Sequence, residues 1–221
     1  GWNLPVRPYI MPGWNLPVHQ LIHPPKRLPM VEGIMSQSNS DSGQDRFHRR
    51  SIRMKGYDYS QPGAYFITIC THQNHALFGK IVDGEMQLNN LGRVVQFTWD
   101  DLVNHVDNIE LGPFMIMPNH IHGIIQIIEP NVGAGSEPAR TEPAPKSSSS
   151  QTSLPEIVRQ FKTFSARRIN TLRNSTDKPV WQRNYYEHII RNDQSFQKIG
   201  EYILTNPVQW ENDRYYPGGT P

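Results

Sequence analysis

The chain of 221 residues contains a single cysteine, Cys70, so it cannot form an internal disulfide. No run of 18 apolar residues occurs, which predicts that no helix spans a membrane. The first residues also lack the charged, apolar and small-residue segments of a signal peptide. These absences favour a protein of the reducing cytoplasm. Hydrophobic residues make up only 36% of the chain, which indicates that a good part of it lies outside a packed core.

Acidic residues are scarce in two segments, although the formal net charge of the whole chain is only +2. RFHRRSIRMK at 46–55 has five Lys or Arg and no acid, and residues 159–191 have eight basic residues against two acids. Basic residues often form a merely solvated surface. Two separate basic segments, the second with Trp and Tyr among its charges, favour a polyanion as the partner.

Proline, glycine and serine mark three segments that we expect to lie outside the fold. Residues 1–45 repeat GWNLPV only twice, too few copies for a solenoid, and predict a disordered segment. Residues 130–153 predict a low-complexity insertion, and residues 211–221 a loose C-terminal tail. One folded domain at 46–210, interrupted by the insertion, is therefore predicted.

The remaining sequence alternates between strand-like and helix-like patterns. Asp-Gly between two short extended runs is a strong hairpin signal, and Ser153 is a suitable N-cap. We therefore predict an α+β fold, in which a mainly antiparallel central sheet carries packed helices. The predicted strands are 64–72, 109–117 and 120–128, with a hairpin at 79–88, and the predicted helices are 90–106, 153–173 and 192–207.

MPNHIHG at 117–123 places two histidines one residue apart at the start of an Ile-rich strand. Residues i and i+2 of a strand share a face, so His120 and His122 can direct both imidazoles at one point. Neutral imidazole is a common ligand of divalent metals. With nine histidines in the chain, roughly 0.36 such pairs are expected by chance. The pair alone therefore decides little, and a third ligand must come from elsewhere.

MPNHIHG, WQRNYYEHIIRN at 181–192 and EYILTNPVQW at 201–210, in this order, resemble the REP-associated tyrosine transposases. These belong to the single-tyrosine HUH transposases, which are named for a His-hydrophobic-His motif. The resemblance runs from about Arg49 to Trp210, and GYDYSQPGAYFITICT at 56–71 resembles the first strand of the family. It implies a ferredoxin- or RRM-like HUH fold, into which residues 130–153 are inserted.

The resemblance also implies a site. The metal ligands of the family fall on His120, His122 and Asn206, and its nucleophile falls on Tyr202. Tyr202 and Asn206 lie four residues apart on a predicted helix and so share one face. Without the resemblance, the sequence predicts that Tyr202 is a core tyrosine and that Asn206 is an ordinary residue before a helix-ending proline.

The implied activity is that of a transposase-type DNA strand transferase and endonuclease. Tyr202 would cleave and rejoin single-stranded or hairpin DNA through a 5′-phosphotyrosine intermediate. A divalent metal, Mg²⁺ or Mn²⁺, would be the cofactor of this reaction. No GxxxxGK[ST] loop occurs, so no nucleotide cofactor is expected. We expect a monomer, with a dimer as the alternative, that associates with the nucleoid when bound to DNA. The expected DNA contacts are Arg46, Arg49, Arg50, Arg53, Lys55, Arg159, Lys162, Arg167, Arg168, Trp181, Arg183, Tyr185, Tyr186 and Arg191.

Two other interpretations stay open. A non-catalytic nucleic-acid-binding protein could use aromatic residues 65 and 66 on an RRM-like sheet, although the full base-stacking signature is absent. A zinc hydrolase could use the histidine pair, but neither HExxH nor a suitably spaced third His or Cys is present. Tyr185 and Tyr186 are rival nucleophiles by position, but they lack a polar partner four residues later.

Overall fold

The computed structural model describes residues 54, 56–129, 152–176 and 178–217. Contacts divide the chain into one unit over Gly1–Arg49 and a second over Arg50–Pro221, and all described residues belong to the second. The predicted disordered segment and nearly all of the predicted insertion lie outside the described residues. The same holds for five of the expected DNA contacts, namely Arg46, Arg49, Arg50, Arg53 and Lys55. In the part that is described, no helix has the length and apolar character needed to cross a membrane.

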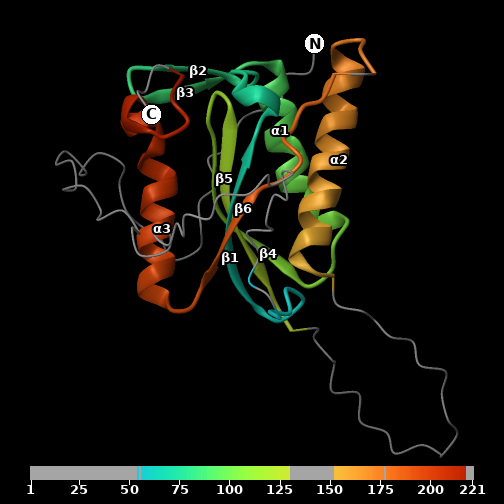
Figure 1. Ribbon diagram of the computed structural model, residues 1–221, viewed down its shortest axis with the longest axis vertical. Helices are drawn as coiled ribbons and strands as arrows, with labels where there is room; N and C mark the ends of the chain where they lie inside the picture. The colour runs from blue at the N-terminus through green and yellow to red at the C-terminus, as the bar shows by residue number, and fades with distance from the viewer. Residues whose placement is uncertain (1–53, 55, 130–151, 177, 218–221) are drawn as a thin grey trace, which may run out of the picture. The chain divides into compact units, whose positions relative to one another are not determined.

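A four-stranded antiparallel sheet forms the centre of the described structure, with the strand order β4-β5-β1-β6. Figure 1 shows α3 on one side of this sheet and α1 and α2 on the other. The predicted α+β fold is thereby confirmed. The sheet strands are β1 (Gly63–Cys70), β4 (Ile109–Ile116), β5 (His120–Ile127) and β6 (Tyr186–Ile190), and β2 (Gly79–Val82) and β3 (Glu85–Leu88) form the predicted hairpin.

The helices are α1 (Asn90–Asp100), α2 (Leu154–Leu172) and α3 (Asp193–Thr205), each within a predicted span. Asn89 caps α1 by accepting from two backbone N–H groups, and Asn192 caps α3 by accepting from the backbone N–H of Ser195. Ser153 stands at the N-cap of α2, but its side chain makes no capping hydrogen bond. A 3₁₀ turn at Asp101–Asn104 follows α1, so this helix is shorter than its apolar spacing predicted.

Strand alternation divides the core between the two faces of the sheet. Ile121 and Ile125 of β5 pack with α1 and α2 in the larger hydrophobic cluster. Ile124 points to the opposite face, where it packs with Ile203 of α3 in a smaller cluster. His120 and His122 share the parity of Ile124, so the strand directs both imidazoles toward the α3 face.

Strand β6 was not predicted from the sequence. It pairs antiparallel with β1, so that Tyr186 lies opposite Thr68 and His188 opposite Phe66. This strand has only five residues, so its alternation of apolar and polar side chains is too short to be recognised in the sequence. The pairing brings the 181–192 motif to the same sheet as the histidines.

Candidate metal centre and tyrosine site

The two histidines of β5 meet at a single point. His120 and His122 are almost completely buried, and their Nε2 atoms lie 3.0 Å apart. Their Cα partners on the neighbouring β1 are Cys70 and Thr68, which fixes both residues in the centre of the sheet. The predicted convergence of the imidazoles is present in the structure.

Hydrogen bonds on the far side of each ring determine which nitrogen faces the meeting point. The Asn119 Nδ2 donates to the backbone oxygens of Tyr215 (2.8 Å) and Asn74 (3.3 Å), so its Oδ1 is left to accept from Nδ1 of His120 at 2.8 Å. Nε2 of His120 therefore carries a lone pair. Thr68 Oγ1 lies 2.8 Å from Nδ1 of His122 and can accept from it in the same manner.

This arrangement fits a metal ion. With both Nδ1 atoms protonated, two Nε2 lone pairs face each other at 3.0 Å, which is unfavourable without a cation between them. Metal-bound histidines usually donate their other N–H to a fixed acceptor, which here would be Asn119 and Thr68. Burial lowers the pKa of His120 well below its usual value and that of His122 to about 3. Both rings are therefore neutral at pH 7, the state that binds metal.

Tyr202 of α3 lies beside this pair. Its hydroxyl is 3.4 Å from Nε2 of His122, and its ring centroid is 5.3 Å from that of the imidazole. The ring also meets Phe66 of β1 edge-on at 6.3 Å. Burial, followed by the charge of Asp213, raises the pKa of Tyr202 to about 12, against smaller opposing effects of the Arg214 charge and of the Asn206 side chain. The hydroxyl is thus protonated at neutral pH.

Asn206 is the C-cap residue of α3 and lies one turn after Tyr202. It is 3% exposed, and its Nδ2 donates to Asp213 Oδ2 at 3.1 Å. Its Oδ1 is buried and has no hydrogen-bond partner among the described residues. A buried acceptor without a partner costs about 1–3 kcal/mol. Such an oxygen suits a cation ligand, the role that the family resemblance implies for this residue.

The C-terminal segment completes the surroundings of the histidines. Ligand atoms of His120, His122 and Asp213 all lie within 4.8 Å of one another. The Tyr215 ring lies 4.6 Å from the His120 ring, centroid to centroid. Sequence reasoning left residues 211–221 outside the domain and so missed both side chains. No periodic pattern could have revealed them, because they follow the 3₁₀ helix Asn206–Asn212 rather than a long helix or strand.

The expected DNA contacts that the structure describes fall into two groups. Arg167, Arg183 and Arg191 are exposed. Arg168, Lys162 and the likewise exposed Arg159 have protein partners, which the sequence alone does not reveal. Arg168 donates to Asp101 at 2.7 Å, Arg159 pairs with Glu156, and Lys162 Nζ donates to the backbone oxygens of Gln182 and Arg183.

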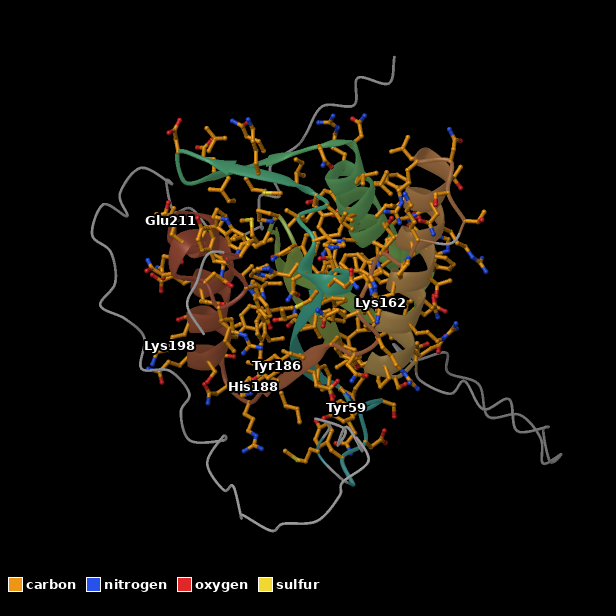
Figure 2. The ribbon with its side chains drawn as sticks, turned by 45° about the horizontal axis from the view of Figure 1, so that its top comes forward. Tyr59, Lys162, Tyr186, His188, Lys198 and Glu211 are labelled. Atoms are coloured by element: carbon orange, nitrogen blue, oxygen red, sulfur yellow. The ribbon has the colours of Figure 1, made fainter. Side chains whose placement is uncertain are left out.

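The aromatic residues at 181–186 differ in accessibility. Trp181 is buried, and its Nε1 donates to Ser165 Oγ at 2.9 Å. Tyr185 packs against the larger core cluster, whereas Tyr186 is 36% exposed. Tyr186 and His188 lie on β6, away from Lys162 on α2 (Figure 2). Of these aromatics, Tyr186 is the most accessible for stacking on a base.

The alternative interpretation, in which residues 65 and 66 stack on bases, conflicts with the burial of both side chains. Tyr65 is completely buried and Phe66 is 8% exposed, because helices cover both faces of the sheet at these positions. The aromatic residues on which that interpretation depends are therefore not available to a nucleic acid.

Comparisons with known proteins give relatives at two levels, and no family model matches the chain. A REP-associated tyrosine transposase bound to a REP hairpin matches with a TM-score of 0.47 and 18% identity, over 72% of this chain and 73% of that one. A protein of Deinococcus radiodurans, provisionally named a transposase, matches with a TM-score of 0.38 and 16% identity, over 69% and 95%. Both proteins are named as transposases, but TM-scores below 0.5 carry no inference about function.

A sequence relative is much more similar. A Haemophilus influenzae protein, described only as uncharacterised, is 47% identical over 174 residues, which cover 76% of this chain and 93% of that protein. Identity at this level over nearly the whole relative indicates common descent and a common fold. The chain therefore belongs to the same protein family as this Haemophilus influenzae protein.

Proposed function

We propose that the chain is a metal-dependent single-strand DNA transesterase of the transposase type. It would cleave and rejoin DNA at hairpin or palindromic repeats through a 5′-phosphotyrosine. One observation carries the proposal: the Tyr202 hydroxyl lies 3.4 Å from Nε2 of His122, where that atom meets Nε2 of His120. A nucleophile beside two converging imidazoles is the combination that such chemistry requires.

His120, His122 and the Oδ1 atom of Asn206 would hold the ion, Mg²⁺ or Mn²⁺. When bound, a divalent ion polarises the scissile phosphate as a Lewis acid. Two imidazoles favour Mn²⁺ over Mg²⁺, because Mg²⁺ prefers oxygen ligands and an octahedral site. The unpartnered Oδ1 of Asn206 and the lone pair on Nε2 of His120 support this ligand set.

Tyr202 would attack the phosphorus of the scissile phosphate. A bond forms between the phenolic oxygen and phosphorus while the bond from phosphorus to the 3′ oxygen breaks. The phenol loses its proton, and the departing 3′ oxygen takes one up. The phosphotyrosine retains the energy of the broken ester, so the rejoining step needs no nucleotide. Because burial raises the pKa of Tyr202 to about 12, the reactive phenolate is scarce at neutral pH, and cleavage should rise with pH.

The DNA would lie across exposed cations and one aromatic ring. Arg167, Arg183 and Arg191 are exposed and can pair with phosphates. Tyr186 can stack on an unpaired base, and its ring lies 6.2 Å from that of Phe66, which also contacts Tyr202. The motif resemblance supplies the hairpin as the substrate class. We infer a monomer in the cytoplasm that is held on the nucleoid when it binds DNA.

Histidine variants test the proposal. His120→Ala and His122→Ala should each abolish cleavage of a labelled hairpin oligonucleotide in Mn²⁺. Hairpin affinity should stay within a few fold, because phosphate contacts dominate it. His75→Ala removes an exposed imidazole and should cleave like the wild type. Cleavage at the wild-type rate by either β5 variant would rule out the proposed function.

A further inference from the structure

The proposed ligands leave the electrostatics of the site incomplete. Histidine binds a cation as a neutral imidazole, so His120 and His122 bring no charge to the ion, and neither does the Asn206 amide. A dication placed among buried neutral groups loses its hydration without gaining an opposite charge, which is costly. The carboxylate of Asp213 is the acidic group whose oxygen clusters with the nitrogens of both histidines, all within 4.8 Å.

The fold holds this carboxylate in place. Asp213 follows the 3₁₀ helix Asn206–Asn212, and its N–H donates to the backbone oxygen of the buried Trp210 at 3.0 Å. Oδ1 accepts from the Tyr215 N–H at 2.7 Å, and Oδ2 accepts from Asn206 Nδ2 at 3.1 Å. Each oxygen keeps a further lone pair for a cation. The side chain is therefore preorganised rather than free in solvent.

The same contact orients Asn206. Because Nδ2 of Asn206 donates to Asp213, its Oδ1 is directed elsewhere and remains buried without a partner in the described part of the chain. A buried amide oxygen without a partner, a fixed carboxylate and two imidazole nitrogens are donor types that together suit a cation site. Carboxylate, amide and imidazole ligands together suit Mn²⁺ and Mg²⁺ better than imidazoles alone.

We propose that Asp213 is a further ligand of the cation that His120 and His122 bind, and that it supplies the negative charge of the ligand set. This inference rests on the metal site of the proposed function and extends it to the C-terminal segment. Metal binding by Asp213 would then also hold the C-terminal segment beside β5, where Tyr215 lies against the ring of His120. The cation is then bound by four side chains: His120, His122, Asn206 and Asp213. Asp213 comes from the segment that follows α3 and its 3₁₀ extension.

Titration of the full chain with Mn²⁺, followed by electron paramagnetic resonance of the free ion, tests the proposal. Asp213→Asn keeps the shape of the side chain and removes its charge, so it should weaken the Kd for Mn²⁺ by at least about tenfold to a hundredfold. Glu211→Gln is the matched control. It removes one negative charge two residues away, from an exposed position on the 3₁₀ helix (Figure 2), and should bind Mn²⁺ within twofold of the wild type.

A second variant pair separates direct ligation from positioning through Asn206. In an Asn206→Ala background, Asp213→Asn should weaken Mn²⁺ binding further, by about tenfold or more, if Asp213 is a ligand. No further loss would mean that Asp213 only orients Asn206, and would overturn the proposal. Circular dichroism of each variant without metal checks that it is folded.

The histidine variants separate this inference from the proposed function. If His120→Ala and His122→Ala lose Mn²⁺ affinity but Asp213→Asn keeps it, only the role of Asp213 is wrong. If neither histidine variant changes the Kd, the metal site itself is wrong, and the inference about Asp213 falls with it. Loss in the histidine variants and in Asp213→Asn, with Glu211→Gln unchanged, supports both.

Discussion

Replacing Gly123 by alanine tests how tightly the strand that carries the histidines is packed. Gly123 follows His122 on β5 and faces α1. A Cβ atom at this position would lie 2.5 Å from Cη2 and 2.8 Å from Cζ2 of Trp99, closer than non-bonded carbons approach. Trp99 has little room to move. It is 2% exposed, its ring stacks 4.2 Å from that of Phe114, and it meets Phe161 edge-on at 5.7 Å.

Gly123→Ala should therefore destabilise the fold by about 1–3 kcal/mol, the usual cost of overpacking a core. In a domain of this size, 1 kcal/mol corresponds to about 2–4 °C in Tm, so we expect a decrease of roughly 2–12 °C. Differential scanning calorimetry of the chain without metal measures this change directly.

A double-mutant cycle identifies the cause. Trp99→Phe replaces the ring system that the new methyl group would meet with a smaller one. Gly123→Ala should then cost less in the Trp99→Phe protein than in the wild type, with a coupling energy of about 0.5–3 kcal/mol. An unchanged Tm for Gly123→Ala, or the same loss in both backgrounds, would refute the reasoning.

Two further changes test the histidine partner and an ion pair. Thr68→Val removes the hydroxyl partner of His122 Nδ1 and should weaken Mn²⁺ binding by about tenfold to a hundredfold, whereas Thr68→Ser, which keeps the hydroxyl, should bind like the wild type. The hydrogen bond from Arg168, followed by that from Asn104, lowers the pKa of Asp101 to about 2. The carboxylate therefore stabilises the fold above pH about 4 and loses this effect as the pH falls toward 2. Asp101→Asn should lower the free energy of unfolding at pH 7 by about 1 kcal/mol, since water screens the pair, and should lose less stability on acidification. Urea unfolding at pH 7 and pH 3 measures both, and a wild-type pH dependence in the variant would contradict the assignment.

Local patterns were sufficient to predict most of the helices and strands. The alternation at 120–128 predicts that His120 and His122 share a face, and they do, because the side-chain period of a strand hardly depends on its neighbours. The helical spacing at 192–207 likewise predicts that Tyr202 faces inward, and Tyr202 packs against the smaller hydrophobic cluster. Neither pattern reveals the distance of 3.4 Å between Tyr202 and His122, which depends on how α3 packs against the sheet.

Features that depend on distant contacts could not be predicted. Asp213 reaches the histidines only because the 3₁₀ helix after α3 turns the chain back toward β5. The charge of Arg168 predicts a DNA contact, yet its side chain donates a hydrogen bond to Asp101, 67 positions earlier in the chain. Charge and spacing indicate which residues are available, but their partners depend on packing: that of α2 against the 3₁₀ turn after α1 for Arg168, and that of the C-terminal segment against β5 for Asp213.

The most direct test of the account is covalent capture of DNA by Tyr202. Tyr202→Phe removes only the hydroxyl, so a tyrosine with a purely structural role would lose about 1 kcal/mol of stability and no activity. We predict that the variant folds, binds a hairpin oligonucleotide, and forms no covalent protein–DNA adduct on a denaturing gel in Mn²⁺. Tyr185→Phe and Tyr186→Phe should still form the adduct. An adduct that persists in Tyr202→Phe, or that disappears in Tyr185→Phe or Tyr186→Phe instead, would contradict Tyr202 as the nucleophile.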